Sequence, residues 1–196
     1  LMTTPGLDVY QMRRSKNVKH YAHLEHSTGD ATMYRLFGID YFDSVLVTGM
    51  YKEKDVRWLE EHRGIKHKEI VSVGCTYLDV YKEKMEKIPA EENHKFTVLL
   101  SPSWRHHAKE IITKVMTGWN VIIRPHPQSK ISEKEMLEKL TEKYKDNKNL
   151  IWDYNSENIY SMKKADIMIS DFSGIIYDYT FLCDKPVMYV NSDMDL

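Results

Sequence analysis

The stretch Ala165–Gly174 reads Ala-Asp-Ile-Met-Ile-Ser-Asp-Phe-Ser-Gly and is followed by a second apolar segment that starts at Ile175. An apolar run, a short polar turn and a new apolar segment predict a buried strand, a tight turn and a helix. Ser170 or Asp171 can cap this helix, and Ser173 places a hydroxyl beside N–H groups without an intrahelical partner. Such a helix start attracts anions, so the turn is a candidate phosphate site.

Seven apolar, β-rich runs recur along the chain, and helical patterns separate them. Several runs are nearly continuous, which is typical of parallel strands buried on both faces. The alternation predicts an α/β fold, a Rossmann-like parallel sheet with helices on both faces. The runs are Ser44–Thr48, Glu69–Val73, Phe96–Ser101, Asn120–Ile123, Leu150–Trp152, Ala165–Ser170 and Pro186–Val190.

The helical patterns carry their own end signals. A capping box at Ser132-Glu133-Lys134-Glu135, with Ile131 and Met136 spaced as a hydrophobic staple, predicts a helix that runs to Tyr144. The other expected helices are Asp55–His62, His107–Thr117, Tyr160–Lys164, the segment after Gly174, and Ala31–Phe37.

The domain organisation follows from where these patterns begin. The regular alternation runs from residue 44 to residue 196, whereas residues 1–43 are a less regular lead-in segment with its own histidine motif. A length of 196 residues suits one domain or a domain and a fraction. We expect the chain to be part of a longer protein.

Composition restricts the function classes. The chain is 42% hydrophobic and 29% charged with a formal net charge of −1, so no global field recruits nucleic acid or an anionic membrane. A short basic cluster at 13–19 predicts a solvated surface, with weak contact to an anionic lipid as the open alternative. Cys75 and Cys183 lie in apolar stretches and are predicted to be core residues. Without a disulfide framework, a reducing, cytoplasmic compartment is expected.

Two further turns directly follow apolar runs: Arg124-Pro125-His126-Pro127 and Ser101-Pro102-Ser103-Trp104-Arg105. The carboxyl ends of parallel strands meet at one edge of a sheet, where ligands bind, so the three turns predict one phosphate-handling site. Arg124 can bind a phosphate through its guanidinium, and the alternative is a structural Arg–carboxylate pair. The flanking prolines hold His126 in a rigid, extended segment. Arg105 is a further candidate for binding, and Asp178 faces either the ligand or solvent.

The histidines of the lead-in segment have a different pattern. His20, His23 and His26 recur every third residue, but no second cluster supplies the remaining ligands of a zinc site, so we expect no metal. His26 is followed by two hydroxyls, a glycine and Asp30, an arrangement that can orient an imidazole as a general base. Thr28 or Asp30 can instead cap the helix that follows.

Read together, these motifs resemble the CDP-glycerol:poly(glycerol phosphate) glycerophosphotransferases, the teichoic acid polymerases and primases. The resemblance runs from about His20 to Tyr189. Members carry His-Gly-Thr, a Gly-Tyr-Pro-like turn, Ala-Pro-Thr-Trp/Phe-Arg, Arg-Pro-His-Pro and Ser-Asp-Tyr-Ser-Ser in this order. The counterparts here are His26-Ser27-Thr28, Gly74-Cys75-Thr76, Ser101–Arg105, Arg124–Pro127 and Ser170–Gly174.

Three positions depart from the family pattern. Ser27 stands in place of the glycine of the first motif, Phe172 in place of the tyrosine, and Gly174 in place of the second serine of the last motif. Because Gly174 has no hydroxyl, a phosphate here would depend more on backbone N–H groups.

The resemblance implies a GT-B architecture, of which residues 44–196 would be the C-terminal, donor-binding half. It implies transfer of glycerol phosphate from CDP-glycerol to a polyol-phosphate polymer or a lipid-linked acceptor, with release of CMP. His26 would act as the base. His126 and Arg124 would steady the pyrophosphate or protonate the leaving group, and Ser173 would hold a phosphate. No cofactor is implied, and the full-length enzyme would be cytoplasmic or peripheral on the inner face of the membrane.

Two alternatives remain open. One is a GT-B glycosyltransferase or a UDP-sugar epimerase-like enzyme, since these share the C-terminal phosphate turn. The other is a nucleotide-binding domain without catalysis, which the altered first motif makes credible. Walker-type, nucleophile-elbow and Gly-x-Gly-x-x-Gly dinucleotide motifs do not occur in the sequence, which argues against P-loop, hydrolase and dehydrogenase functions.

Overall fold

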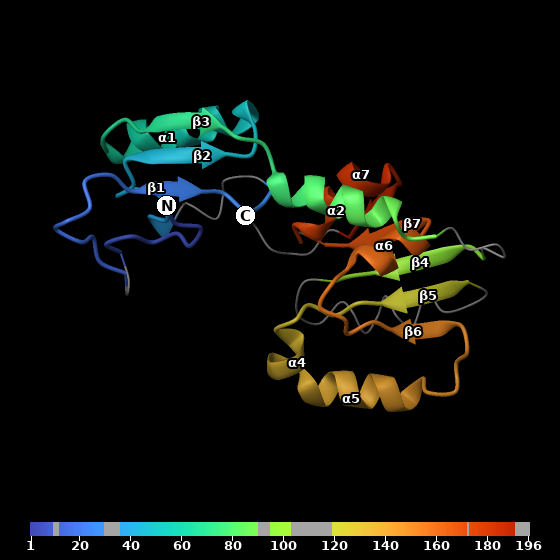
Figure 1. Ribbon diagram of the computed structural model, residues 1–196. Helices are drawn as coiled ribbons and strands as arrows, with labels where there is room; N and C mark the ends of the chain where they lie inside the picture. Colours follow the sequence, from blue (N-terminus) through green and yellow to red (C-terminus); the bar gives the residue numbers. More distant parts are fainter. Residues whose placement is uncertain (10–11, 30–35, 90–94, 103–118, 172, 191–196) are drawn as a thin grey trace. The chain divides into compact units, whose positions relative to one another are not determined.

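The computed structural model describes residues 1–9, 12–29, 36–89, 95–102, 119–171 and 173–190 (Figure 1). Residues 1–77 form one compact unit, here called unit 1, and the described residues from 78 onward form unit 2. Helix α2 (Thr76–Glu86) begins at the boundary. The helix expected at His107–Thr117 lies outside the described residues, as does most of the one expected at Ala31–Phe37.

Unit 1 contains a parallel sheet in the order β1-β2-β3 (Figure 1). The strands are β1 (Ala22–Leu24), β2 (Ser44–Val47) and β3 (Glu69–Ser72). The 3-10 helix η2 (Met50–Lys52) and helix α1 (Glu53–Arg63) follow β2. Val45 and Val47 lie on the same face of β2, and both are fully buried in a core with Val56 and Leu59 of α1.

The contacts of unit 1 do not follow the expected division at residue 43. Strand β1 of the lead-in segment pairs with β2, with Ala22 opposite Ser44 and Leu24 opposite Leu46. Leu7, Ile39 and Phe42 belong to the same core as Val45. The lead-in segment is therefore joined to β2 and β3 by both a sheet and a core.

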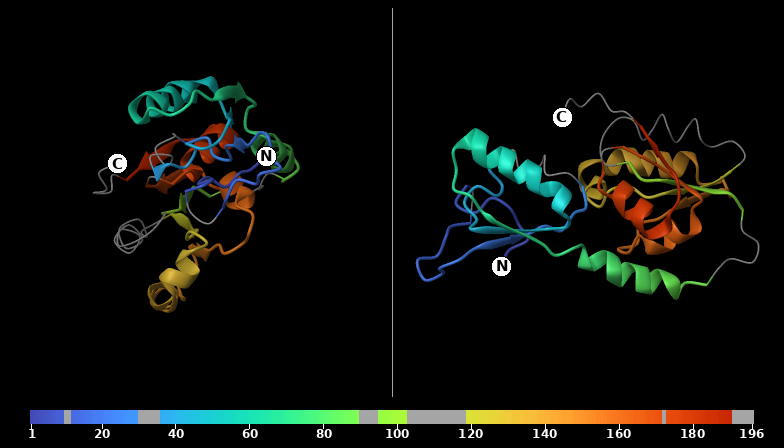
Figure 2. Two further views of the ribbon diagram at one scale, coloured as in Figure 1. Left: turned by 90° about the vertical axis from the view of Figure 1, so that its left-hand side faces the viewer. Right: turned by 90° about the horizontal axis from the view of Figure 1, so that it is seen from above.

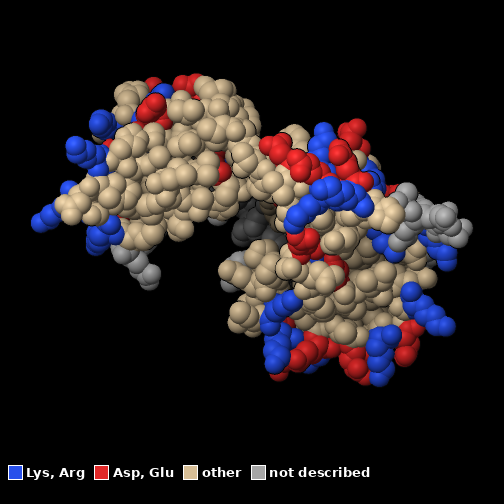
Figure 3. Space-filling view, viewed as in Figure 1, with Lys and Arg blue, Asp and Glu red and all other residues tan. Residues whose placement is uncertain are grey.

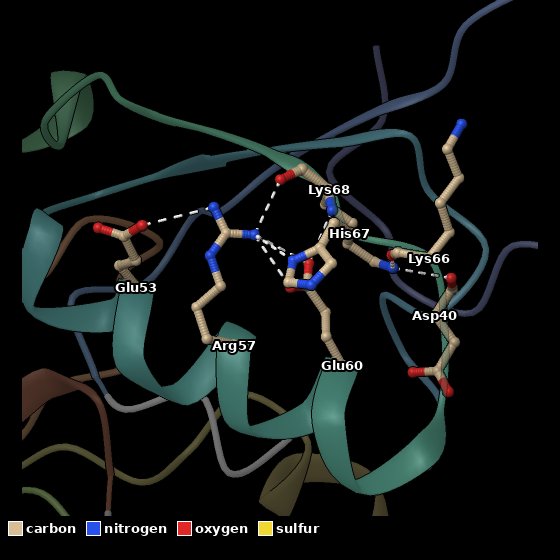
Figure 4. A network of polar contacts seen from close by, with 7 residues as sticks. All are labelled: Asp40, Glu53, Arg57, Glu60, Lys66, His67 and Lys68. Carbon is tan, nitrogen blue, oxygen red and sulfur yellow. Dashed lines mark hydrogen bonds and ion pairs between the residues drawn. The ribbon is translucent and has the colours of Figure 1, made fainter.

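Buried Glu60 of α1 connects this helix to the start of β3 (Figure 4). Its carboxylate accepts hydrogen bonds from the Lys68 amide (2.7 Å) and from Arg57 Nη1 (2.9 Å), and it pairs with His67 Nδ1 (2.8 Å). The buried Lys68 ammonium donates to the Asp40 carbonyl (2.9 Å). The network thus fixes the chain between α1 and β3, where β3 enters the sheet.

Unit 2 is built on a second parallel sheet, in the order β6-β5-β4-β7-β8. The strands are β4 (Thr97–Leu100), β5 (Asn120–Ile123), β6 (Leu150–Trp152), β7 (Ile167–Ser170) and β8 (Val187–Tyr189). The helices are α4 (Ser129–Ser132), α5 (Lys134–Lys143), α6 (Ile159–Lys164) and α7 (Ile175–Cys183). The predicted α/β fold with parallel strands is confirmed.

Helices cover both faces of the sheet of unit 2 (Figures 1 and 2). Leu99 of β4 lies in a core with residues of α2, α6 and α7, among them Met162 and Tyr179. Its neighbours Val98 and Leu100 lie in a separate core with Leu140 of α5. Because successive side chains of a strand point to opposite faces, the two cores place α5 on one face and the other three helices on the opposite face.

Two local predictions about helix starts are wrong. Ser132 is the last residue of α4, and its hydroxyl donates to the Gln128 carbonyl (3.1 Å) instead of capping a new helix. Helix α5 begins after Glu133 without a side-chain cap, and Ile131 is 86% exposed, so the expected staple does not form. Likewise neither Ser170 nor Asp171 is at the N-cap position of α7, which is occupied by Gly174.

Replacement of Glu60 by Gln should destabilise unit 1 by about 1–3 kcal/mol near neutral pH, since buried hydrogen bonds lose their charged acceptor. Burial alone would raise the pKa of Glu60, but the Lys68 amide and Arg57 lower it below its ordinary value of 4.5. The stabilisation is therefore present above pH 4.5 and is lost as the pH falls through the folded-state pKa. Thermal unfolding of both proteins at several pH values measures this. An equal difference at pH 7 and in strong acid would contradict it.

Candidate functional site

The order of strands in unit 2 defines a topological switch point between β4 and β7. From β4 the chain proceeds outward through β5 and β6 on one side, and β7 and β8 lie on the other side. In open parallel sheets, ligands bind in the crevice outside the carboxyl ends of the strands at such a point. Ser101 and Pro102 follow β4, and the turn Asp171–Gly174 follows β7, so two of the predicted turns flank the switch point.

The three predicted turns are hydrogen-bonded to one another. The Ser101 amide donates to the Ile169 carbonyl (3.0 Å), and the Ser170 hydroxyl donates to the Ser101 carbonyl (2.5 Å). The Ser101 hydroxyl donates to the carbonyl of Arg124 (3.3 Å), whose amide donates to Leu100 (2.8 Å). The expected convergence of these turns at one edge of the sheet is therefore observed.

The guanidinium of Arg124 is turned into the protein. Nη1 lies 2.6 Å from Oδ2 of Asp153, and Nη2 donates to the carbonyls of Asn155 (2.7 Å) and Ser156 (3.3 Å). The two charged side chains are only 11% and 5% exposed. These contacts correspond to the Arg–carboxylate alternative, and they occupy the two terminal nitrogens that a phosphate clamp would use.

Asp153 was not identified from the sequence. It directly follows β6, and it also accepts hydrogen bonds from the Ser161 hydroxyl and from the Asn155 amide (2.9 Å). Burial alone would raise the pKa of Asp153, but these hydrogen bonds and Arg124 lower it below its ordinary value of 3.8. Its position one residue after an apolar run is the same signal that identified the other turns, so a search of every strand end would have found it.

His126 lies half-buried between its two prolines, directly after β5. Its Nδ1 lies 3.2 Å from the backbone nitrogen of Gln128, which carries a hydrogen and can only donate. Nδ1 is therefore the acceptor, and the proton of the neutral ring is on Nε2. The imidazole can present an N–H donor through Nε2.

The turn after β7 contains the remaining candidates. Ser170 is buried and its hydroxyl holds the Ser101 carbonyl, so it joins two turns. Ser173 is half-buried, and Gly174, which has no side chain to form a cap, is exposed at the N-cap position of α7. Asp178 lies in the first turn of α7, where a carboxylate interacts favourably with the helix dipole. Asp171 is buried at the end of β7. Arg105 lies outside the described residues.

The three histidines of the lead-in segment have separate surroundings. Nε2 of His20 contacts the Ser44 hydroxyl (2.9 Å). His23 is fully buried against the ring of Phe42, and burial together with the charges of His26 and Lys52 lowers its pKa to about 4. His26 is exposed in the loop that follows β1. Within the described residues, no cluster of three metal-ligating side chains is present.

A groove of about 650 Å³ lies between α5 and the segment after β6. It is lined by Lys130, Lys134, Leu137, Glu138, Thr141, Glu142 and Tyr154. Its charges are of both signs, and Figure 3 shows such mixing over the visible face of unit 2. None of the predicted site residues lines this groove, so it is separate from the switch point.

Comparison with known proteins gives the family. The model of the CDP-glycerol:poly(glycerophosphate) glycerophosphotransferases matches residues 37–196, and the chain belongs to this family. The resemblance inferred from the motifs is thereby confirmed. No curated protein sequence matches the chain significantly.

Solved structures agree with the fold. The wall teichoic acid polymerase TagF matches with a TM-score of 0.51 and 16% identity, over 90% of this chain and 50% of that chain. A histidine-to-asparagine variant of TagF soaked with CDPG matches with a TM-score of 0.53 and 17% identity, over 90% and 49%. The chain spans about half the length of these polymerase chains. Within the described residues, no helix is both long and apolar enough to cross a membrane.

Replacement of Asp153 by Asn should destabilise unit 2 by about 3–5 kcal/mol, because it leaves the buried Arg124 without its charged partner. Chemical denaturation followed by tryptophan fluorescence measures the loss, since Trp152 lies next to the substituted residue. The matched control is Asp153→Leu combined with Arg124→Met. This control removes both charges and should cost less than the single substitution. A single variant as stable as the wild type would contradict the role of the pair.

Proposed function

We propose that the protein to which this chain belongs transfers glycerol phosphate from CDP-glycerol to a hydroxyl of a teichoic-acid-like polymer or lipid-linked primer, with release of CMP. The family membership supports this reaction. The observation that carries it is the hydrogen-bonded convergence of the turns after β4, β5 and β7 at the switch point, beside the start of α7. This is where an open parallel sheet binds a nucleotide.

The start of α7 provides the anion-binding part of the proposed site. The positive end of its dipole favours a phosphate, and Ser173, which would contribute a hydroxyl, directly precedes its N-cap residue. Because Gly174 supplies no hydroxyl, the backbone of the turn would carry most of the contact. Unit 2 would thus be the donor-binding half of a GT-B protein.

The two histidines take complementary roles. The acceptor hydroxyl attacks the distal phosphorus of CDP-glycerol in line, its proton passes to His26, and the bond between this phosphorus and the CMP oxygen breaks. Nε2–H of His126 donates a hydrogen bond to the pyrophosphate and supports the charge that develops on departing CMP. Positioning and charge stabilisation supply most of the rate in such transfers. Arg124 acts indirectly, by holding the turn that carries His126.

The acceptor proposed here is a polyol phosphate polymer or a lipid-linked primer, and the enzyme would work in the cytoplasm at the inner face of the membrane. Neither nucleic acid nor a cofactor has a part in this scheme. Transfer of another polyol phosphate by the same chemistry would be seen as turnover of the corresponding CDP-polyol.

Replacement of His126 by Ala in the full-length protein should lower kcat for CDP-glycerol by a factor of ~10²–10³, the usual cost of losing one charge-stabilising donor. The melting temperature should stay near that of the wild type, because His126 is only half-buried. Release of CMP measures turnover. His62→Ala, which changes an exposed histidine of α1, is the control and should keep full activity. Undiminished turnover of His126→Ala would refute the role of this residue.

Calorimetric titration of the full-length protein should show that CDP binds and that Ser173→Ala weakens CDP about tenfold, the expected loss of one hydrogen bond to a charged group. UDP should bind more weakly than CDP. Tighter binding of UDP and UDP-sugars would favour the glycosyltransferase or epimerase alternative. CDP binding without any transfer from CDP-glycerol would favour the non-catalytic alternative.

A further inference from the structure

Lys52, the last residue of η2, is a fully buried lysine. Its side chain is 2% exposed, and its Nζ lies 2.8 Å from Oε2 of Glu25, whose side chain is 0% exposed. The removal of two charges from water costs free energy that their attraction often fails to repay, so a buried ion pair is weak evidence for stability. The position of this pair in unit 1 suggests a different role.

The Lys52 ammonium reaches both sides of His26. Its ion-pair partner Glu25 precedes His26, and the carbonyl that accepts its hydrogen bond (2.7 Å) belongs to Ser27, which follows His26. One nitrogen atom therefore fixes the chain immediately before and immediately after this histidine. His26 itself is exposed, so its backbone is held while its ring faces outward.

Two further residues between β2 and α1 hold the same loop. The Thr48 amide donates to Oε2 of Glu25 (3.3 Å), and its hydroxyl donates to the Ser27 carbonyl (3.3 Å). The Tyr51 hydroxyl donates to the Thr28 carbonyl (2.7 Å). We call Thr48, Tyr51 and Lys52 the loop clamp.

In the part of the chain that the structure describes, the carboxylate of Glu25 is contacted at only one of its two oxygens. Oε2 receives both Lys52 and the Thr48 amide, whereas Oε1 is buried and has no hydrogen-bond donor among the described residues. A carboxylate with one unsatisfied oxygen is an expensive group to bury. Packing alone therefore does not explain a carboxylate at this position, whereas the geometry that it imposes on the loop does.

We propose that Lys52, through its pair with Glu25 and together with Thr48 and Tyr51, is a positioning residue for His26. This inference rests on the proposed function, in which His26 receives the proton of the acceptor hydroxyl. A proton acceptor must lie within hydrogen-bond reach of its donor, and small displacements of a reacting group cost large factors in rate. The clamp fixes the loop so that the imidazole keeps one position without itself being buried.

The test replaces both charges, Glu25→Met together with Lys52→Met, in the full-length protein. This change keeps volume and leaves no unpaired charge, so the protein should fold. We expect kcat to fall ~10–100-fold with KM for CDP-glycerol unchanged, since donor binding is assigned to unit 2. The matched control is Asp40→Leu with Arg63→Met, which removes another ion pair of unit 1 (2.5 Å) and should leave kcat unchanged.

Thr48→Val combined with Tyr51→Phe covers the case in which the methionine pair fails to fold. It deletes only two hydroxyls and should lower kcat about 3–10-fold, again at constant donor KM. Wild-type kcat in this variant, or in a folded methionine pair, would overturn the proposal. So would a rise in donor KM with kcat unchanged, because that would assign the clamp to donor binding.

A double-mutant cycle separates this inference from the proposed function. In a His26→Ala background the clamp substitutions should cause no further loss of residual turnover, because the group they position is already gone. A further loss equal to that in the wild type would show that the clamp acts independently of His26. If the wild type releases no CMP from CDP-glycerol, the proposed function itself fails, and that result is obtained before any variant is made.

Discussion

The buried ion pair between Arg124 and Asp153 is the contact on which the edge of unit 2 depends. Arg124 follows β5 and Asp153 follows β6, and the same guanidinium also binds two carbonyls of the segment that leads to α6. Ser101 and Ser170 extend the connection to β4 and β7. Four strand ends are thus tied into one surface, and His126 and the start of α7 are positioned by that surface without having to be buried in it.

The sequence predicted the positions of most strands well, but it did not predict how the strands are divided between two sheets. Buried parallel strands are apolar on both faces, so runs such as Val98-Leu99-Leu100 stand out, and the predicted runs coincide with β2 to β8 within two residues at each end. β1 escaped notice because it is three residues long and has buried His23 at its centre. The pairing of β1 with β2 depends on a core that draws on Leu7, Ile39 and Phe42, which local periodicity does not reveal.

The candidate site was predictable in its residues but only partly in their roles. The meeting of the turns follows from the parallel direction of the strands, which the alternation of strands and helices in the sequence predicts. The partner of Arg124 does not follow, because Asp153 is 29 residues away and lies beside it only through the order β6-β5-β4. The motif likewise predicts that the Ser170 hydroxyl caps a helix. In the structure this hydroxyl donates to the carbonyl of Ser101, which follows the neighbouring strand β4.

The chain around each of the two histidines is held in a different way. At His126, the rings of the two flanking prolines restrict the backbone, and the hydrogen bond from the Gln128 amide to Nδ1 selects the tautomer. At His26 the restraint is electrostatic, since no proline flanks it and the buried Lys52 holds the residues on either side. In the proposed mechanism, the rigid turn at His126 holds the Nε2–H donor of this residue toward the pyrophosphate of CDP-glycerol. In the same mechanism, the hydrogen bonds of the loop clamp hold the residues beside His26 in one position without burying the imidazole, which stays open to an acceptor hydroxyl.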